Sequence, residues 1–128
     1  MNHLPDALYT PEQVRELDRR AIEAHGIPGR VLMARAGRSA WRLLRRRFPR
    51  ARRLLVLCGG GNNGGDGYVM ARLAADAGFA VELCAFADPA GLSGDARTAA
   101  DEALARITPV AFSPQRLDSV DLVVDALL

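Results

Sequence analysis

The segment LLVLCGGGNNGGDG, residues 54–67, joins a run of five apolar residues to a glycine-rich loop. Such a run is typical of a strand that is buried on both faces, as the strands of parallel sheets are. After the loop, apolar residues recur at helical spacing from residue 69 to residue 77. A strand, a glycine loop and a helix in this order predict one unit of an α/β fold, in which the helix leads to a second, parallel strand.

The sequence on both sides of this unit continues the same plan. We expect further strands at 80–87, 109–112 and 122–128, and further helices at 11–25, 30–48 and 93–106. This order predicts a Rossmann-like, three-layer α/β/α fold with a mostly parallel sheet, a central strand at 54–58 and helices on both faces. The strand at 122–128 has no crossover helix after it. We therefore expect residues 1–128 to be the N-terminal part of a single, truncated domain, incomplete at its C-terminus.

Composition and charge narrow the class of protein. Basic and acidic residues nearly balance, at 17 and 15, so the chain as a whole has no strong field. The sequence has neither a signal peptide pattern nor a membrane-spanning apolar stretch, so we expect a cytoplasmic protein with no membrane partner. Cys58 and Cys84 lie in apolar runs, where buried thiols are expected rather than a disulfide or a metal site.

A basic cluster extends from Arg42 to Arg53. Clustered arginines can contact nucleic acid through its phosphates. No recognition motif accompanies the cluster, and aromatic residues do not interleave with it in the way that nucleic-acid surfaces show. The sequence therefore favours a solvated helix end and no nucleic-acid partner.

The glycine loop predicts a site for an anion, because glycines let a phosphate approach the backbone and a helix N-terminus offers free amides. Gly59, Gly61 and Gly64 also satisfy the spacing of a dinucleotide fingerprint, which keeps a nicotinamide oxidoreductase as an alternative. Asp66 would repel a pyrophosphate in this position. Either Asp66 caps a helix that begins near Gly67, or a cation lies close to it.

Asp125 is the second candidate, at the end of the apolar run 122–124. Ligands of open α/β sheets bind beyond the carboxyl ends of the strands, so Asp125 and the glycine loop are expected to share one site. Asp125 can instead simply accept hydrogen bonds from the loop that follows it. For Asn62 and Asn63 the alternative to ligand binding is a role as turn residues with left-handed backbones, and the two roles are compatible.

Residues 61–67, GNNGGDG, resemble the signature loop of the YjeF N-terminal domain family, the NAD(P)HX epimerases. The similarity extends to Gly26-Ile27-Pro28, Leu32-Met33, Ala36-Gly37 and Val123-Val124-Asp125-Ala126-Leu127. The resemblance implies an isomerase of nicotinamide nucleotide repair, which interconverts the R and S forms of hydrated NADH and NADPH (NADHX and NADPHX). It also implies an ADP- or ATP-dependent dehydratase as partner, which can be fused downstream, and a homodimer as one assembly.

By position, the resemblance assigns the substrate site to Asn62, Asn63, Gly64, Gly65 and Asp66. It assigns one potassium ion to Asn63 and Asp125, and such an ion would offset the carboxylates beside the pyrophosphate, since hard cations prefer oxygen ligands. No catalytic residue is assigned, because the family's acid is expected beyond Leu128. Residues 1–128 alone are therefore expected to be inactive.

A noncatalytic scaffold module of the same family is the alternative from another class of function. A scaffold needs the fold but not a particular set of polar side chains in the loop. The joint presence of Asn63, Asp66 and Asp125 therefore favours the enzyme over the scaffold. The nicotinamide oxidoreductase is the third alternative.

Overall fold

The computed structural model describes residues 7–128. The helices are α1 (Pro11–Glu23), α2 (Gly29–Arg47), α3 (Asn62–Asp76) and α4 (Gly94–Leu104), with short 3₁₀ helices η1 (Pro89–Gly91) and η2 (Pro114–Ser119). The strands are β1 (Arg53–Cys58), β2 (Ala80–Ala85) and β3 (Leu122–Ala126). Each predicted helix is present, with ends that differ from the prediction by a few residues.

The three strands form one parallel sheet in the order β2-β1-β3. Leu54 of β1 pairs with Val81 of β2 on one side and with Leu122 of β3 on the other, so the prediction of a central strand at 54–58 is confirmed. The prediction of a strand at 109–112 is wrong. This segment makes one backbone hydrogen bond to the sheet, from Val110 N to Leu83 O at 2.9 Å, and Pro109 has no N–H with which to extend a ladder.

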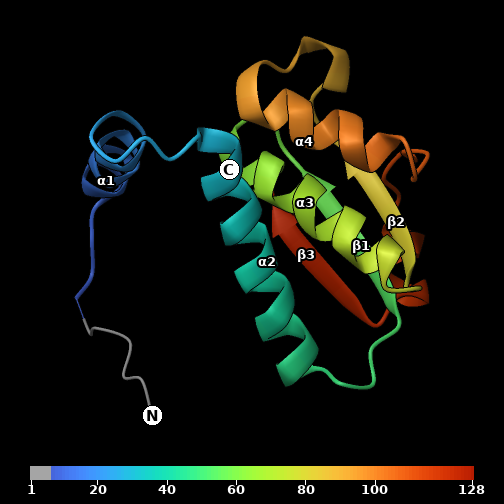
Figure 1. Cartoon of the computed structure of the whole chain (residues 1–128). Helices are drawn as coiled ribbons and strands as arrows, with labels where there is room; N and C mark the ends of the chain where they lie inside the picture. Colours follow the sequence, from blue (N-terminus) through green and yellow to red (C-terminus); the bar gives the residue numbers. More distant parts are fainter. Residues whose placement is uncertain (1–6) are drawn as a thin grey trace.

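The main helices are layered on one face of the sheet. Helix α3 lies directly against the strands, and α2 and α4 pack against α3 (Figure 1). The second face is contacted by η2, which packs on β1. The α/β class with a parallel sheet is therefore confirmed, while the α-helices expected on the second face are not found within residues 7–128.

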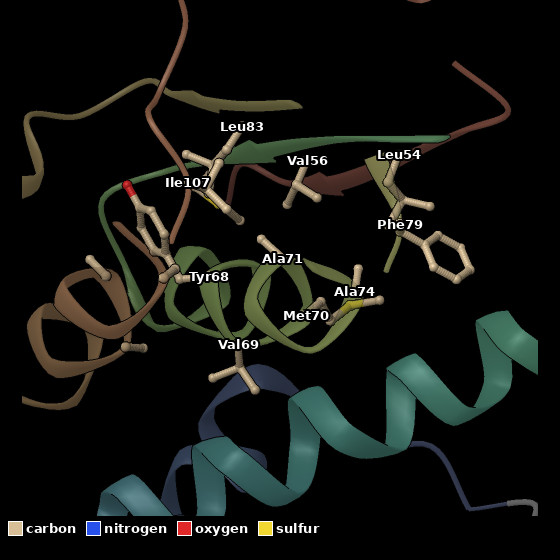
Figure 2. Packing of buried hydrophobic residues seen from close by; sticks show 14 of the residues in the cluster. Leu54, Val56, Tyr68, Val69, Met70, Ala71, Ala74, Phe79, Leu83 and Ile107 are labelled. Carbon is tan, nitrogen blue, oxygen red and sulfur yellow. The ribbon is translucent and has the colours of Figure 1, made fainter. Parts of the chain in front are cut away.

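The core lies between β1 and α3. Leu54 and Val56 point from β1 toward Ala71 and Ala74 of α3, and all four are fully buried (Figure 2). Alanines on the helix keep the two backbones close. On its outer side α3 turns Val69 toward α2, so the helix is packed from both directions.

Helix α1 lies outside this core (Figure 1). It contacts α2, and its Asp18 and Ile22 line a small cavity together with residues of α2, α3 and α4. It begins with the predicted capping box: Thr10 Oγ1 accepts from Gln13 N at 3.2 Å, and Gln13 Oε1 accepts from Thr10 N at 2.8 Å. None of its residues is buried. No helix within residues 7–128 is long and apolar enough to span a bilayer.

Candidate functional site

The candidate site lies where the strands end at their carboxyl edge. Gly59, directly after β1, donates its N–H to Ala126 O at 2.8 Å, and Phe86 N donates to Cys58 O at 2.9 Å. The backbone pairing of the sheet therefore continues into the glycine loop. This brings the end of β3 against the segment that leads into α3, as the alternation of strands and helices predicts.

The glycines of the loop serve packing as well as ligand access. A Cβ atom on Gly64 would overlap the carbonyl oxygen of Gly59, and one on Gly59 would overlap the carbonyl oxygen of Leu127. A Cβ on Gly67 would lie 2.7 Å from Ala126 Cβ. The start of α3 is thus fixed against β3 by backbone contacts that tolerate no side chain at these positions.

Helix α3 begins at Asn62, five residues before the predicted start near Gly67. Within residues 7–128 no residue other than glycine has a positive φ, so the alternative of a left-handed turn at Asn62 and Asn63 is wrong. The Asp66 cap is wrong too, because Asp66 lies in the second turn and the N-cap is Gly61. Glycine has a low helix propensity, but the close contacts of Gly64 and Gly67 are available only in the helical conformation seen here.

The first turn of α3 has the properties of an anion site. The N-cap Gly61 has no side chain to accept hydrogen bonds from the first amides. The first backbone N–H groups of a helix have no partner within the helix, and the helix dipole is positive at this end. Asn62 and Asn63 are exposed beside these amides, while Gly64 and Gly65 are buried beneath them.

Asp66 borders a small acidic cavity of about 160 Å³ between α3 and the other helices. The carboxylates of Asp18 from α1 and Asp95 from α4, and the side chain of Asn62, also line it. The pKa of Asp66 is raised from 3.8 to about 6, mainly by burial and to a smaller extent by the negative charge of Asp18. Asp66 is therefore a carboxyl group that can exchange a proton near neutral pH.

Asp125 lies exposed on β3, opposite Leu57 of β1. Its Oδ1 accepts from Leu127 N at 3.2 Å, which is the bond that the strand-end alternative expects. Its neighbour Ala126 packs against α3, so the side chain of Asp125 leaves the strand on the other face. Asp125 and Asn63 both belong to the carboxyl edge, and their convergence on one ion stays a prediction.

Sequence reasoning did not single out Tyr68. Its hydroxyl is buried without a hydrogen-bond partner in the structure, on the side of α3 that faces α4 (Figure 2). Burial raises the pKa of Tyr68 to about 12, with a smaller contribution from Cys58. The sequence signal was weak, because an aromatic residue at a helical apolar position is indistinguishable from a core residue.

The two cysteines are structural, as the sequence predicts. Cys58 and Cys84 are both free and buried, and burial raises the pKa of Cys58 to about 12. A thiol with such a pKa is a poor nucleophile and a poor metal ligand near neutral pH. Among residues 7–128, no three His, Cys, Asp or Glu side chains are grouped as metal ligands.

Comparisons with known proteins agree with this geometry. Residues 29–128 match the family described as YjeF-related protein N-terminus. The chain is 43% identical over 122 residues to the bifunctional NAD(P)H-hydrate repair enzyme Nnr of Coxiella burnetii, covering 94% of this chain and 25% of that protein. It is 40% identical over 124 residues to the NAD(P)H-hydrate epimerase of Rhodopirellula baltica, covering 93% of this chain and 50% of that protein.

A solved structure has the same fold. The crystal structure of the yeast protein ynu0 (YNL200c) superposes with a TM-score of 0.76 at 22% sequence identity, over 95% of this chain and 56% of that one. The chain thus spans about half the length of this structure and of the epimerase relative, and a quarter of the bifunctional relative.

Proposed function

Since the chain belongs to the YjeF-related N-terminal family, we propose that it takes part in the epimerisation of hydrated NADH and NADPH. The observation that carries this proposal is the first turn of α3. Its uncapped amides and the exposed Asn62 and Asn63 sit where the strands of the sheet end. The names of the relatives, NAD(P)H-hydrate epimerase and NAD(P)H-hydrate repair enzyme, point to a substrate with a pyrophosphate for such a position.

Within this proposal, Asn62, Asn63, Gly64, Gly65 and Asp66 form the substrate site. The amides of the first turn bind the pyrophosphate, and the exposed asparagines orient the nucleotide through their amide groups. The glycines keep the floor of the site free of side chains. Burial raises the pKa of Asp66 to about 6, so Asp66 is mostly ionised at physiological pH and its charge has to be offset when the pyrophosphate binds.

We propose one potassium ion between Asn63 and Asp125. Both offer oxygen donors, which suit a hard cation, and both lie exposed at the carboxyl edge. Shared ligation needs an oxygen separation on the order of 5 to 6 Å, and a separation beyond about 9 Å would exclude it. The test is Asp125→Ala in a chimera in which residues 1–128 replace the matching half of the Rhodopirellula baltica epimerase. Loss of epimerase activity together with loss of its response to potassium supports the ion. If activity and potassium response are unchanged, Asp125 is only an acceptor for Leu127 N.

We also propose that residues 1–128 are the N-terminal part of one epimerase domain in a cytoplasmic repair system. The half coverage of the epimerase relative supports this. The bifunctional relatives support a dehydratase as partner, fused or separate. The homodimer stays a prediction.

The experiment compares two proteins in one assay. Residues 1–128 alone, and a chimera in which they replace the matching half of the Rhodopirellula baltica epimerase, are tested for conversion of the R epimer of hydrated NADPH. We expect the chimera to accelerate epimerisation, and residues 1–128 alone to match the spontaneous rate, because the resemblance to the family places the catalytic acid beyond Leu128. Acceleration by residues 1–128 alone would place the catalytic acid within them.

Variants of the chimera separate the enzyme from the scaffold alternative. Asn63→Ala removes a ligand group from the first turn and should lower the rate at least about tenfold, the cost of one well-placed polar contact. The matched control is Asp118→Ala, which removes an exposed polar side chain of η2 far along the chain from the loop. A folded chimera whose activity survives Asn63→Ala would contradict this site.

A further inference from the structure

Charge is distributed very unevenly along this chain. Residues 24–65 contain ten arginines and no aspartate or glutamate, while all fifteen acidic residues lie outside this segment with the other seven arginines. The near balance of the whole chain therefore hides a strongly basic segment. A genomic preference for arginine over lysine cannot explain it, because such a preference does not remove acidic residues.

In the structure, most arginines of this segment also have no carboxylate close to them in space. Outside it, each of the seven arginines forms an ion pair with a carboxylate: Arg15, Arg19, Arg20, Arg72, Arg97, Arg106 and Arg116. Within it, Arg53 alone does so, with Asp121 at 2.9 Å. In the part of the chain that the structure describes, the other nine have no carboxylate within ion-pair distance, so their charge is available to a partner.

Five of these arginines recur at helical spacing on α2 and are exposed, and we call them the α2 basic face: Arg35, Arg38, Arg42, Arg45 and Arg46. The last three line a hollow of their own, while Arg35 and Arg38 border a groove toward α3 and α4 that Asp95 and Glu102 also line. The opposite side of α2 is buried through Met33, Gly37 and Leu44. At 1.5 Å per residue the face is about 15 Å long, which suits an elongated anion better than a single small ion.

An aromatic pair lies at one end of this face. Trp41 packs edge-on against Phe79 with ring centroids 5.0 Å apart. The guanidinium of Arg45 lies 5.5 Å from the Trp41 ring and 5.3 Å from the Phe79 ring, and that of Arg52 lies 5.6 Å from the Phe79 ring. A guanidinium held over a ring is already ordered and keeps N–H groups free for phosphate.

A hollow of about 530 Å³ opens beside this pair, lined by Ser39, Trp41, Arg42, Arg45 and Arg46. The half-buried Trp41 contributes part of an aromatic surface within it. Guanidinium and aromatic groups together provide stacking surfaces for a base, while neighbouring arginines bind the phosphates. The prediction of a solvated helix end gave no weight to Trp41, which directly precedes Arg42 in the sequence, and the structure places Trp41 among the arginines of this hollow.

We propose that the α2 basic face binds single-stranded nucleic acid, with phosphates along the arginines and one base in the hollow at Trp41. This site is separate from the proposed substrate site. Helix α2 runs from the edge where α3 begins to the opposite end of the molecule, and Trp41 and the last arginines lie in its distal half (Figure 1). A membrane is a poorer fit, because a surface-bound helix inserts an exposed apolar face and that of α2 packs on α3.

The test measures binding of fluorescein-labelled (rU)15 and (dT)15 to residues 1–128 by anisotropy, over a series of salt concentrations. Five phosphate contacts predict a slope of log K against log salt of about −3.5. Arg42→Gln, Arg45→Gln and Arg46→Gln together should weaken binding at least about tenfold at low salt and reduce the slope by about 2. The matched control replaces Arg15, Arg20 and Arg106 by Gln, which makes the same change in net charge, and it should bind almost as the parent does.

Three outcomes would overturn the proposal. If the control weakens binding as much as the α2 triple variant does, only net charge acts. If Trp41→Leu binds the oligonucleotides as tightly as the parent does, and inorganic polyphosphate competes equally well for both proteins, no base is stacked. If vesicles containing phosphatidylserine bind and neither oligonucleotide does, the face is a membrane surface. A thermal melt of each variant confirms that it is folded, and (rU)15 against (dT)15 shows whether RNA or DNA is preferred.

Discussion

Helices α1 and α3 are similar in length but are held in place by different interactions. None of the residues of α1 is buried, and its surface is laced by local ion pairs such as Glu16–Arg19 at 2.7 Å and Glu16–Arg20 at 2.8 Å. In α3, eight of fifteen residues are buried and the first turn has no side-chain cap. Helix α1 is therefore stabilised within itself, while α3 is stabilised by the sheet and by its neighbouring helices.

This difference predicts which substitutions will change the stability of the whole domain. Interactions within α1 are exposed, and exposed ion pairs contribute little to the stability of a domain. Contacts of α3 with β1, β3 and α2 are buried and involve the candidate site directly. Changes in α3 should therefore alter global stability, and changes in α1 should alter only the helix in which they are made.

Gly64→Ala should have the largest effect. The added Cβ overlaps the carbonyl oxygen of Gly59, which is backbone and cannot turn aside, so the free energy of unfolding should fall by about 3 kcal/mol or more. Urea unfolding followed by circular dichroism measures it. Gly61→Ala is the matched control, since nothing lies within 4 Å of a Cβ there. Equal stability of the two variants would show that α3 is not held by this contact.

The same contrast explains how much of the fold could be predicted from the sequence. The start of α1 was predicted correctly, because Thr10, Pro11 and Gln13 specify a capping box among themselves. The start of α3 was placed five residues late, because Gly65 and Gly67 pack against Met33 and Ala126, which are distant in sequence, and these contacts cannot be read from the loop alone.

In the candidate site, too, features set by local sequence could be predicted and features set by tertiary packing could not. The position of Asp125 at a strand end followed from the apolar run before it. The acidic neighbours of Asp66 were not predictable, because Asp18 comes from α1 and Asp95 from α4, and only the packing of the helices brings them to one cavity.

Tyr68→Phe should have the second largest effect, of opposite sign. The buried Tyr68 hydroxyl has no hydrogen-bond partner, and its removal ends the desolvation cost of an unpaired polar group. The free energy of unfolding should rise by about 1.5 kcal/mol. Tyr9→Phe is the matched control, because Tyr9 is 55% exposed and its hydroxyl can reach water. A loss of stability in Tyr68→Phe would mean that the hydroxyl is satisfied in solution.

Asp66→Asn tests the acidic cavity through its pH dependence. The pKa of Asp66 in the folded protein, about 6, lies above its ordinary value of 3.8. Its protonated form therefore favours folding below pH 4, and this contribution to stability is lost as the pH rises through 6. The free energy of unfolding of the variant should therefore equal that of the parent near pH 4 and exceed it by about 1 kcal/mol at pH 8. This figure is reduced because the carboxyl group is half exposed. Asp118→Asn should show no such rise, and a difference constant across this pH range would contradict the assignment.

Thr10→Ala should have the smallest effect on global stability and the clearest local one. It removes the acceptor for Gln13 N, and the loss of an N-cap destabilises a helix by about 1 kcal/mol. Because α1 buries no residue in the core, that cost should appear as local opening: hydrogen exchange of the α1 amides should quicken about fivefold. The free energy of global unfolding should change by less than about 0.5 kcal/mol. If global stability instead falls by the full cost of the cap, α1 unfolds together with the sheet, and the two helices belong to one cooperative unit despite their different contacts. Leu17→Ala then distinguishes the cause, since Leu17 is 51% exposed and can lower global stability only if the apolar side of α1 is covered in solution.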